Sequence, residues 1–438
     1  KIFRKLMTEI IFVVTIGSIL GMFAGLVPGI GIFASLIMIY PFLITLTPME
    51  TIFLYISLAC ATQYFGSVTA IYFGVPGESS SLPAVIEGHA LYGQGRAHEA
   101  IVFSSIGSFL GSFVGIAFFS LLAFMLSGFF PTSLQQFLAL AVIGLASTIL
   151  IKNSIKAKIL MFVIPLFIAH LGMPGMSVTP KFNLGFDFVK YGIHYFPFIL
   201  GLICAKQIMF ADTVTPSNAQ KNKANPLDFL RYKLSFLRGC IVGGFGGMIP
   251  GLTTMASSNF SYSLEKHVSE DHHDKSMRCL VSAETANNVG SITQLMPLLL
   301  FGLPITASET VLYNVIQSKG WLPGSDNFWN VLSMGWPVLL VANFMMLLLS
   351  WRYAWTLTKL IPKNGTMFKA IMLVICACLS YYVGDLIAKE GLKFLIIFFL
   401  CLPFAAVSKN TNYMPLAFWL VIGENLLDNF YRLILQLY

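Results

Sequence analysis

Charged side chains are scarce in this sequence. Of its 438 residues, 11% are Asp, Glu, Lys or Arg, whereas a soluble globular domain carries about 25%. Hydrophobic residues account for 56%, and the mean hydropathy is +0.78. Because a helix needs about 20 apolar residues to cross a bilayer, roughly ten to twelve transmembrane helices or half-helices fit. The composition excludes an ordinary soluble protein and predicts an all-α polytopic membrane protein.

The sequence also lacks the signatures of disulfide, metal and enzyme chemistry. Its seven cysteines are an odd number scattered through apolar runs, which argues against a disulfide framework. No serine nucleophile elbow, phosphate-binding loop or haem motif occurs. We therefore expect no catalytic residues, no metal site and no organic cofactor. A membrane-embedded enzyme would need a cluster of His, Asp, Glu or a nucleophile inside the spans, and the histidines are scattered.

The net charge of +8 comes from basic residues in the short connections between apolar runs. In that position they indicate topology and contact with lipid headgroups, not nucleic acid. The longest polar connection, residues 213–235, divides the chain into a first membrane half, 1–212, and a second, 236–438. We expect this linker and the N-terminus on the cytoplasmic side. A polar loop is expected over Glu265–Lys275, and Arg96 is expected to be an exposed loop cation. The first apolar run is too long for a signal peptide and is expected to be a retained span.

An internal repeat is the most informative feature that is present. Residues 17–40 align without a gap with residues 239–262, and ten of the twenty-four positions are identical. Each copy is an apolar helix with glycines every fourth residue, broken by Pro-Gly and then resumed. The glycine ridges Gly21-x-x-x-Gly25 and Gly243-x-x-x-Gly247 predict close packing against neighbouring helices. Matching broken helices in two halves of a membrane protein are typical of transport sites. We favour two related, inverted repeats; parallel repeats are the alternative, because basic residues precede both copies of the broken helix.

The two Pro-Gly breaks are the first candidate substrate site. Proline removes a backbone donor and glycine relieves the chain of Cβ restrictions, so the helix must open at Gly29 and at Gly251. Each resumed helix then presents free N–H groups and a positive dipole end, which suit an anion. The neighbouring candidates are Gly31, Ser35, Thr253 and Thr254. The alternative is a simple proline kink with glycines for helix packing.

A Gly-Ser-x-Thr motif occurs downstream in each half, and a proline turn follows it. The candidate substrate-binding hydroxyls of the motifs are Ser67, Thr69, Ser291 and Thr293. The candidates of the turns are Gly77, Ser79, Ser80 and Thr306. Serine at such a turn caps a helix or donates to a bound oxyanion, and an ordinary capped loop is the alternative. We expect these turns and the Pro-Gly breaks to converge near mid-membrane.

Glu284, Asn287 and Asn288 interrupt an otherwise apolar region and are the candidate site for a coupling cation, Na+ or H+. Hydrogen bonding between helices, or capping by Glu284, is the alternative. The broken-helix segments contain no Lys or Arg. An anionic substrate would therefore be held by amides and hydroxyls, and a bound cation would offset its charge. This pattern favours coupled uptake.

These motifs belong to longer runs of sequence. The runs in the first half are Gly25-Leu-Val-Pro28-Gly29-Ile-Gly31, Tyr64-Phe-Gly66-Ser67-Val-Thr69-Ala70, Val75-Pro76-Gly77-Glu78-Ser79-Ser80 and Gly93-Gln-Gly95-Arg96-Ala97-His-Glu99-Ala100. Those in the second half are Ile249-Pro250-Gly251, Ser261-Tyr262-Ser263-Leu264-Glu265-Lys266, Ala283-Glu284-Thr-Ala286-Asn287-Asn288 and Gly302-Leu303-Pro304. In this order the chain resembles the large membrane (permease) subunit of tripartite tricarboxylate transporters. It departs from the family pattern at Thr253, where another glycine is usual, and at Ile305, where Gly or Ser is usual.

The resemblance implies secondary active uptake of small organic di- or tricarboxylates across the bacterial inner membrane, coupled to an ion gradient without ATP. It also implies a small four-span membrane subunit and a periplasmic solute-binding protein that delivers the substrate. Association of the chain with further copies of itself is left open. The alternatives are an uncoupled anion channel or pore and a membrane scaffold subunit.

Overall fold

The computed structural model is helical throughout the residues it describes, with one isolated bridge between Leu171 and Phe182. The described residues are 2–27, 31–74, 76–126, 133–150, 153–172, 181–182, 185–210, 224–248, 253–269, 274–321, 326–358, 365–409, 411, 413, 415–420, 423, 426–427 and 430–431. This confirms the all-α class predicted from the sequence.

The first half contains α1 (Ile2–Leu26), α2 (Gly31–Met38), α3 (Tyr40–Leu43), α4 (Pro48–Phe73), η1 (Ser79–Ser81), η2 (Ala84–Gly88), α5 (His89–Gly93), α6 (Ala97–Leu126), α7 (Ser133–Leu150), α8 (Ile155–Ala169), η3 (Asp187–Val189), α9 (Phe196–Ile199), η4 (Leu200–Cys204) and α10 (Ala205–Phe210). The rest contains η5 (Pro226–Tyr232), α11 (Lys233–Gly246), α12 (Thr253–Val268), α13 (Lys275–Thr293), α14 (Leu295–Phe301), α15 (Ala307–Gln317), α16 (Asp326–Thr358), α17 (Gly365–Ala388) and α18 (Gly391–Val407).

Five helices are long and apolar enough to cross a membrane by length and composition, within the part of the chain that the structure describes. They span Met7–Leu26, Pro48–Phe73, Ala97–Leu126, Gly335–Thr358 and Lys369–Leu386. In the second span, in α4, every residue from Thr51 to Phe73 is buried by the surrounding helices, whereas the other spans expose apolar side chains. The helix α4 therefore lies at the centre of the molecule.

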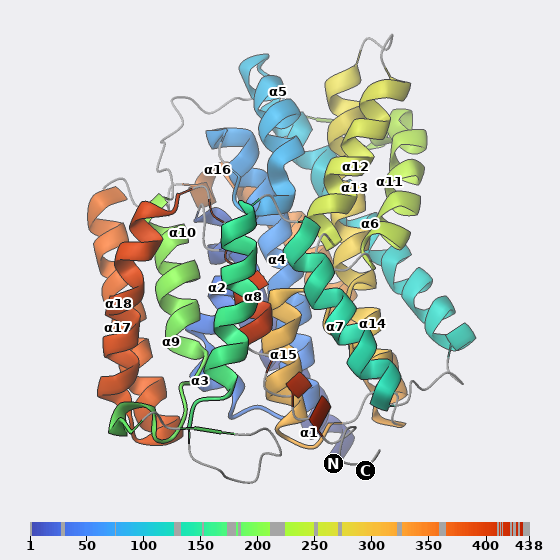
Figure 1. Ribbon diagram of the computed structural model, residues 1–438. Coiled ribbons are helices and arrows are strands. Elements are labelled where there is room, and N and C mark those ends of the chain that lie inside the picture. Colours follow the sequence, from blue (N-terminus) through green and yellow to red (C-terminus); the bar gives the residue numbers. More distant parts are fainter. Residues whose placement is uncertain are drawn as a thin grey trace.

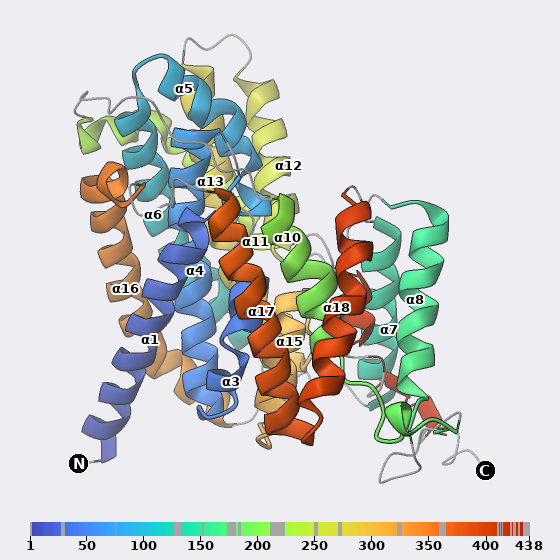
Figure 2. The same cartoon turned by 90° about the vertical axis from the view of Figure 1, so that its left-hand side faces the viewer.

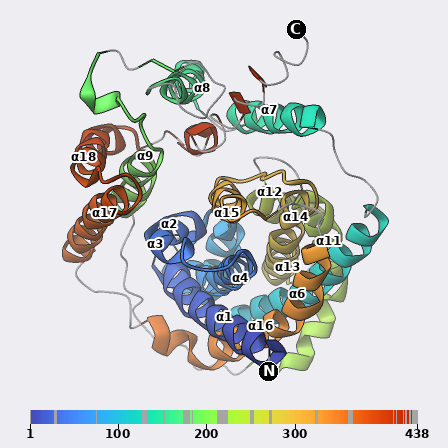
Figure 3. The same cartoon turned by 90° about the horizontal axis from the view of Figure 1, so that it is seen from below.

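The helices form two groups (Figures 1, 2 and 3). A central group consists of α1–α6 and α11–α16, and a peripheral group consists of α7–α10, α17 and α18. The two groups meet where the hydroxyls of Tyr40 and Tyr195 lie 3.2 Å apart and the Tyr40 ring packs on Phe196. Each half of the sequence contributes helices to both groups.

Glycines let the central helices approach closely. A Cβ on Gly25 of α1 would lie 2.5 Å from the carbonyl oxygen of Thr62 in α4. A Cβ on Gly243 of α11 would lie 2.6 Å from the carbonyl oxygen of Ala286 in α13. Both distances are too short for a side chain, so the backbones touch at these positions. The close packing predicted for the glycine ridges is therefore confirmed.

The two packed pairs run in opposite directions. In Figure 1, α1 begins at the lower end beside the N-terminus, and α4 runs parallel to it. By contrast, α11 and α13 begin at the upper end beside α5 and descend. Between the pairs, α6 packs on α13, where Gly111 approaches the carbonyl oxygen of Thr285.

One polar segment differs from the sequence prediction. A loop was expected over Glu265–Lys275, but α12 continues to Val268. The carboxylate of Glu265 is fully buried and accepts hydrogen bonds from Arg238 at 2.6 Å and Ser235 at 2.7 Å. These partners on α11 stabilise the last turn of α12, and the charged residue therefore lies inside the helix packing.

Candidate functional site

The centre of the candidate site is a contact between the two halves. The hydroxyl of Ser67, on α4, donates a hydrogen bond of 2.5 Å to Oε2 of Glu284, on α13. Both side chains are buried. The Gly-Ser-x-Thr motif of the first half and the polar run of the second half, which the sequence predicted separately, therefore meet.

The proline turn after α4 folds back against this contact. A Cβ on Gly77 would lie 2.5 Å from the carbonyl oxygen of Gly25 and 2.5 Å from the Cα of Gly66. Only glycine fits there without displacing backbone, which explains why the turn carries this residue. The turn brings Glu78 against Gly66, the residue that precedes Ser67.

Helix α12 closes the site from the second half. The hydroxyl of Ser258 donates to the carbonyl oxygen of Ser80 at 2.9 Å. The hydroxyl of Ser257 lies 3.3 Å from the position of a Cβ on Gly290. The first-half turn thus packs against the resumed helix of the second half.

An unusual number of buried polar atoms in this region have no hydrogen-bond partner among the described residues. They include Gln63 Nε2 and Oε1, Tyr64 Oη, Glu78 Oε2, Ser80 Oγ, Ser81 Oγ, Glu284 Oε1, Asn287 Nδ2 and Oδ1, and Asn288 Oδ1. A folded domain usually leaves only a few such groups, because each costs about 1–3 kcal/mol. The unpartnered donors and acceptors near α4 and α13 could therefore form hydrogen bonds with a polar ligand.

Several predicted hydroxyls have partners within the protein. Thr69 donates to the carbonyl oxygen of Gly25 at 2.9 Å, and Thr293 lies 3.2 Å from that of Gly243. Ser291 donates to the carbonyl oxygen of Asn288. Thr306 caps α15 in a capping box with Glu309. These contacts stabilise the carbonyl groups and helix ends on which the site is built.

The helix breaks are described in part. Gly29 and Gly251 lie outside the described residues, and the side chains of Ser79 and Thr253 are likewise not described. Gly31 begins α2 with a φ of +61°. The hydroxyl of Ser35 donates a hydrogen bond to the carbonyl oxygen of Gly31 at 2.7 Å. Thr254 is buried near the start of α12.

Asn287 and Asn288 differ in their surroundings although both are fully buried. Asn288 Nδ2 donates to Ser108 of α6 at 2.7 Å and to the carbonyl oxygen of Glu284. Neither side-chain atom of Asn287 has a partner among the described residues. Asn288 is therefore anchored to α6, and Asn287 keeps both polar groups available.

Sequence reasoning missed three residues of this site. Glu78, Ser81 and Gln63 were not selected, although Glu78 stands in the quoted Pro-Gly-Glu-Ser-Ser run. A carboxylate directly after a Pro-Gly turn in an apolar chain was the available signal. Gln63 offered a weaker one, since it lies a helical turn before Ser67.

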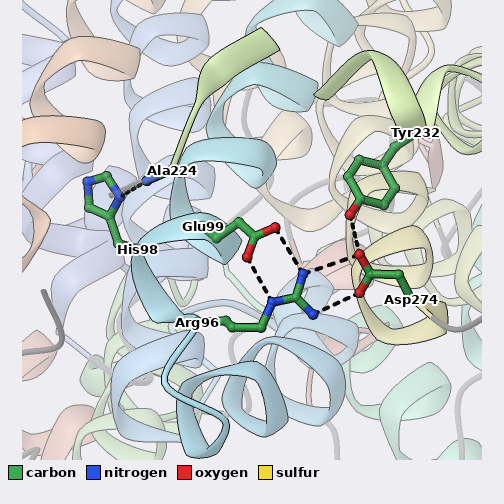
Figure 4. Close-up of polar contacts among 6 residues, drawn as sticks. All are labelled: Arg96, His98, Glu99, Ala224, Tyr232 and Asp274. Carbon is green, nitrogen blue, oxygen red and sulfur yellow. Dashed lines mark hydrogen bonds and ion pairs between the residues drawn. The ribbon is translucent and has the colours of Figure 1, made fainter. Parts of the chain in front are cut away.

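A second polar cluster lies at the upper end of the central group (Figure 4). Arg96 makes ion pairs of 2.8 Å with Glu99 and with Asp274, which in turn accepts a hydrogen bond from Tyr232. Hydrogen bonds to the two carboxylates raise the pKa of Arg96, and burial followed by the bond to Asp274 raises the pKa of Tyr232. The sequence suggested an exposed loop cation at Arg96, but this residue joins the start of α6 to the start of α13.

The sequence comparisons agree with this architecture. The model of the "Tripartite tricarboxylate transporter TctA family" matches residues 11–415. An uncharacterised 52.8 kDa protein in the TAR-I ttuC' 3' region of Agrobacterium vitis is 27% identical over 354 residues, covering 76% of this chain and 70% of the relative. An uncharacterised protein in the TAR-II ttuC' 3' region of the same organism is 25% identical over 118 residues, covering 25% of this chain and 47% of that relative. No solved structure matches.

Proposed function

The chain belongs to the tripartite tricarboxylate transporter TctA family, and we propose that it is the large membrane subunit that carries the substrate. The proposed substrates are small organic di- or tricarboxylates, taken up by secondary active transport with a coupled cation and without ATP. The observation that supports this most is the buried set of unpartnered polar atoms between α4, the Gly77 turn and α13.

The chemistry of these groups suits a carboxylate. Amide and hydroxyl donors of Gln63, Asn287 and Ser81 have no partner among the described residues, and each can donate to an oxyanion. Because no lysine or arginine stands in the broken-helix segments, binding relies on neutral donors. Such binding is weaker than pairing with a fixed positive charge, which favours release on the other side.

The coupling ion is proposed to bind beside the substrate, near Glu284, Asn287 and Asn288. A cation there offsets the charge of the bound carboxylate. Each species then raises the affinity for the other, since binding free energies of coupled sites are reciprocal. This mutual dependence is what converts an ion gradient into substrate accumulation.

Alternating access is proposed to arise from movement of the central group against the peripheral group. We further propose that the two halves are inverted repeats. The opposite directions of the α1–α4 and α11–α13 pairs support this, as do the left-handed glycines Gly74 and Gly302 that end α4 and α14. Inverted repeats with a site near their interface are a recurrent design of secondary transporters.

The family also underlies a proposal about partners and location. A small four-span membrane subunit and a periplasmic solute-binding protein that delivers substrate are proposed to act with this chain in a bacterial inner membrane. Uptake of labelled di- and tricarboxylates into proteoliposomes tests this. We expect saturable uptake that requires the small subunit and the binding protein. Flux that never saturates and ignores both proteins would instead support a pore, and absence of flux for every carboxylate would support a scaffold.

A further inference from the structure

Two glutamates from different halves of the chain lie against adjacent residues of α4 at the candidate site. Oε2 of Glu284 accepts a hydrogen bond from the hydroxyl of Ser67. The neighbouring Gly66 lies against Glu78, because a Cβ on this glycine would be 3.6 Å from the Glu78 nitrogen and 3.7 Å from its Cβ. Since Ser67 directly follows Gly66 in α4, Glu78 and Glu284 contact adjacent residues of the same helix.

The two groups differ in access to water. Glu284 is fully buried, and its Oε1 has no partner among the described residues. Glu78 is partly exposed, but its Oε2 is buried and likewise lacks a partner there. Glu78 is therefore the more exposed member of the pair, and Glu284 is the more deeply buried one.

No positive side chain offsets this pair among the described residues. The elements packed around Glu284 present Ser67 from α4, Ser108 from α6 through Asn288, Gly243 from α11, and Ser261 from α12 through Ser282. Besides Glu78, the titratable groups on the elements around α13 include Tyr64 of α4, whose hydroxyl has no partner among the described residues. They also include Glu87 of η2, which accepts a hydrogen bond from Tyr262 of α12, and Glu265 of α12, which is paired with Arg238 of α11. Two like charges in a medium of low dielectric constant cannot both be ionised cheaply, so such a pair retains a cation.

We propose that Glu78 and Glu284 share one proton, and that this proton is the coupling ion of transport. This inference rests on the proposed function. On one side of the membrane a carboxylate of the pair takes a proton from water and becomes a neutral carboxyl group. On the other side the O–H bond breaks and the proton returns to water, which restores the carboxylate.

The neighbouring amide explains how the proton is tied to the substrate. Asn287 lies about one helical turn after Glu284 and is fully buried, with both polar groups unpartnered among the described residues. A carboxylate substrate bound by this amide would face two negative charges if the pair were ionised. Protonation removes one of them, so substrate and proton bind together and travel in the same direction.

The direct test is infrared spectroscopy of the purified chain in lipid vesicles during a pH titration. The carbonyl stretch of a protonated carboxyl group should appear and disappear reversibly with pH. Glu284→Gln should remove this band, and Glu78→Gln should shift its titration. Glu309→Gln identifies any contribution from the other fully buried carboxyl group, which accepts the backbone N–H groups of Ile305 and Thr306 and whose Oε1 also has no partner among the described residues. This variant should keep the band assigned to Glu284.

Two outcomes would overturn the inference. One is a titrating band that both Gln variants leave unchanged. The other is binding of radioactive sodium that is lost in Glu284→Gln without any titrating carboxyl band, which would assign the pair to Na+. Either result leaves the proposed carboxylate transport intact. A titrating pair in a chain that moves no carboxylate would contradict the proposed function and not the shared proton.

A transport assay supplies a second, independent readout. In wild-type vesicles a pH gradient should increase uptake of labelled carboxylate. Glu284→Gln should lose this stimulation, whereas its exchange of labelled for unlabelled substrate should fall much less, because exchange needs no net proton movement. Retained exchange also demonstrates that the variant is folded. Full stimulation by the pH gradient in this variant would contradict the proposal.

Discussion

Ser67 Oγ donates a hydrogen bond of 2.5 Å to Oε2 of Glu284, although the two residues are 217 positions apart in the sequence. The bond joins the two halves of the chain inside the membrane-embedded core. It also leaves the second carboxyl oxygen of Glu284 without a partner among the described residues. The same carboxyl group therefore both connects the halves and is available for chemistry.

Ser67→Ala removes the one described partner of this carboxyl group. A hydrogen bond to a charged group contributes about 1.5–3 kcal/mol, and each 1.4 kcal/mol corresponds to about tenfold. We expect the rate of carboxylate uptake into proteoliposomes to fall about ten- to hundredfold. Ser263→Ala is the control, since this exposed hydroxyl donates only to the carbonyl oxygen of Asn259 on the same helix. Equal uptake by both variants would contradict the assignment.

Asn287→Ala and Asn288→Ala should separate a ligand-binding amide from a structural one. Asn288 donates to Ser108, so its loss leaves a hydroxyl of α6 unpaired and should lower the melting temperature in detergent. Asn287 has no described partner to lose, so its truncation should change the melting temperature less. Uptake should nevertheless fall more in Asn287→Ala. The reverse order of the two uptake rates would show that the unpartnered amide is not part of the site.

Gly77→Ala places a methyl group 2.5 Å from the carbonyl oxygen of Gly25 and from the Cα of Gly66. Overpacking of this kind costs about 1–3 kcal/mol and displaces the turn that carries Glu78. We expect a lower melting temperature and a strong loss of uptake. Gly93→Ala introduces the same methyl group where nothing lies within 4 Å, and it should leave both unchanged. Normal uptake by Gly77→Ala would remove this turn from the transport site.

A double-mutant cycle on Arg96 and Asp274 measures the connection in Figure 4. The guanidinium contacts Asp274 through two nitrogens, at 2.8 and 3.2 Å, and both side chains are about two-thirds buried or more. We expect a coupling free energy of about 1 kcal/mol from thermal unfolding of Arg96→Ala, Asp274→Ala and the double variant.

The pair of Lys389 and Asp385 is the matched control for this cycle. It is more exposed and its nitrogen–oxygen distance is 3.5 Å. Its coupling free energy should be close to zero. Equal coupling in the two cycles would mean that Arg96 does not fasten α6 to α13.

The sequence was more informative about the individual helices than about which residues contact each other between them. Composition and the glycine ridges were sufficient for the helical class and for the close packing at Gly25 and Gly243, because both depend on local sequence. The partner of Glu284 could not be found in this way, since the contact depends on how α4 and α13 are brought together. For the same reason the capping role of Thr306 was one of two open alternatives until the position of Glu309 was known.

Burial of charge was the least predictable feature. Glu265 and Arg96 stand in polar runs that indicate exposed loops, but both have ion-pair partners from distant segments. A charged side chain in a polar run is solvated unless tertiary structure supplies a partner, and the sequence does not identify that partner. Glu78 was passed over because its significance depends on Glu284 in the other half.

The measurement that tests the account most directly is the final level of labelled carboxylate inside proteoliposomes, compared with the level outside, under an imposed cation gradient. The vesicles contain the chain with the proposed small membrane subunit and the proposed binding protein. We predict accumulation above the outside concentration that collapses when an ionophore abolishes the gradient. Equilibration to the outside concentration, with no response to either a sodium or a proton gradient, would contradict coupled transport and identify the chain as a pore.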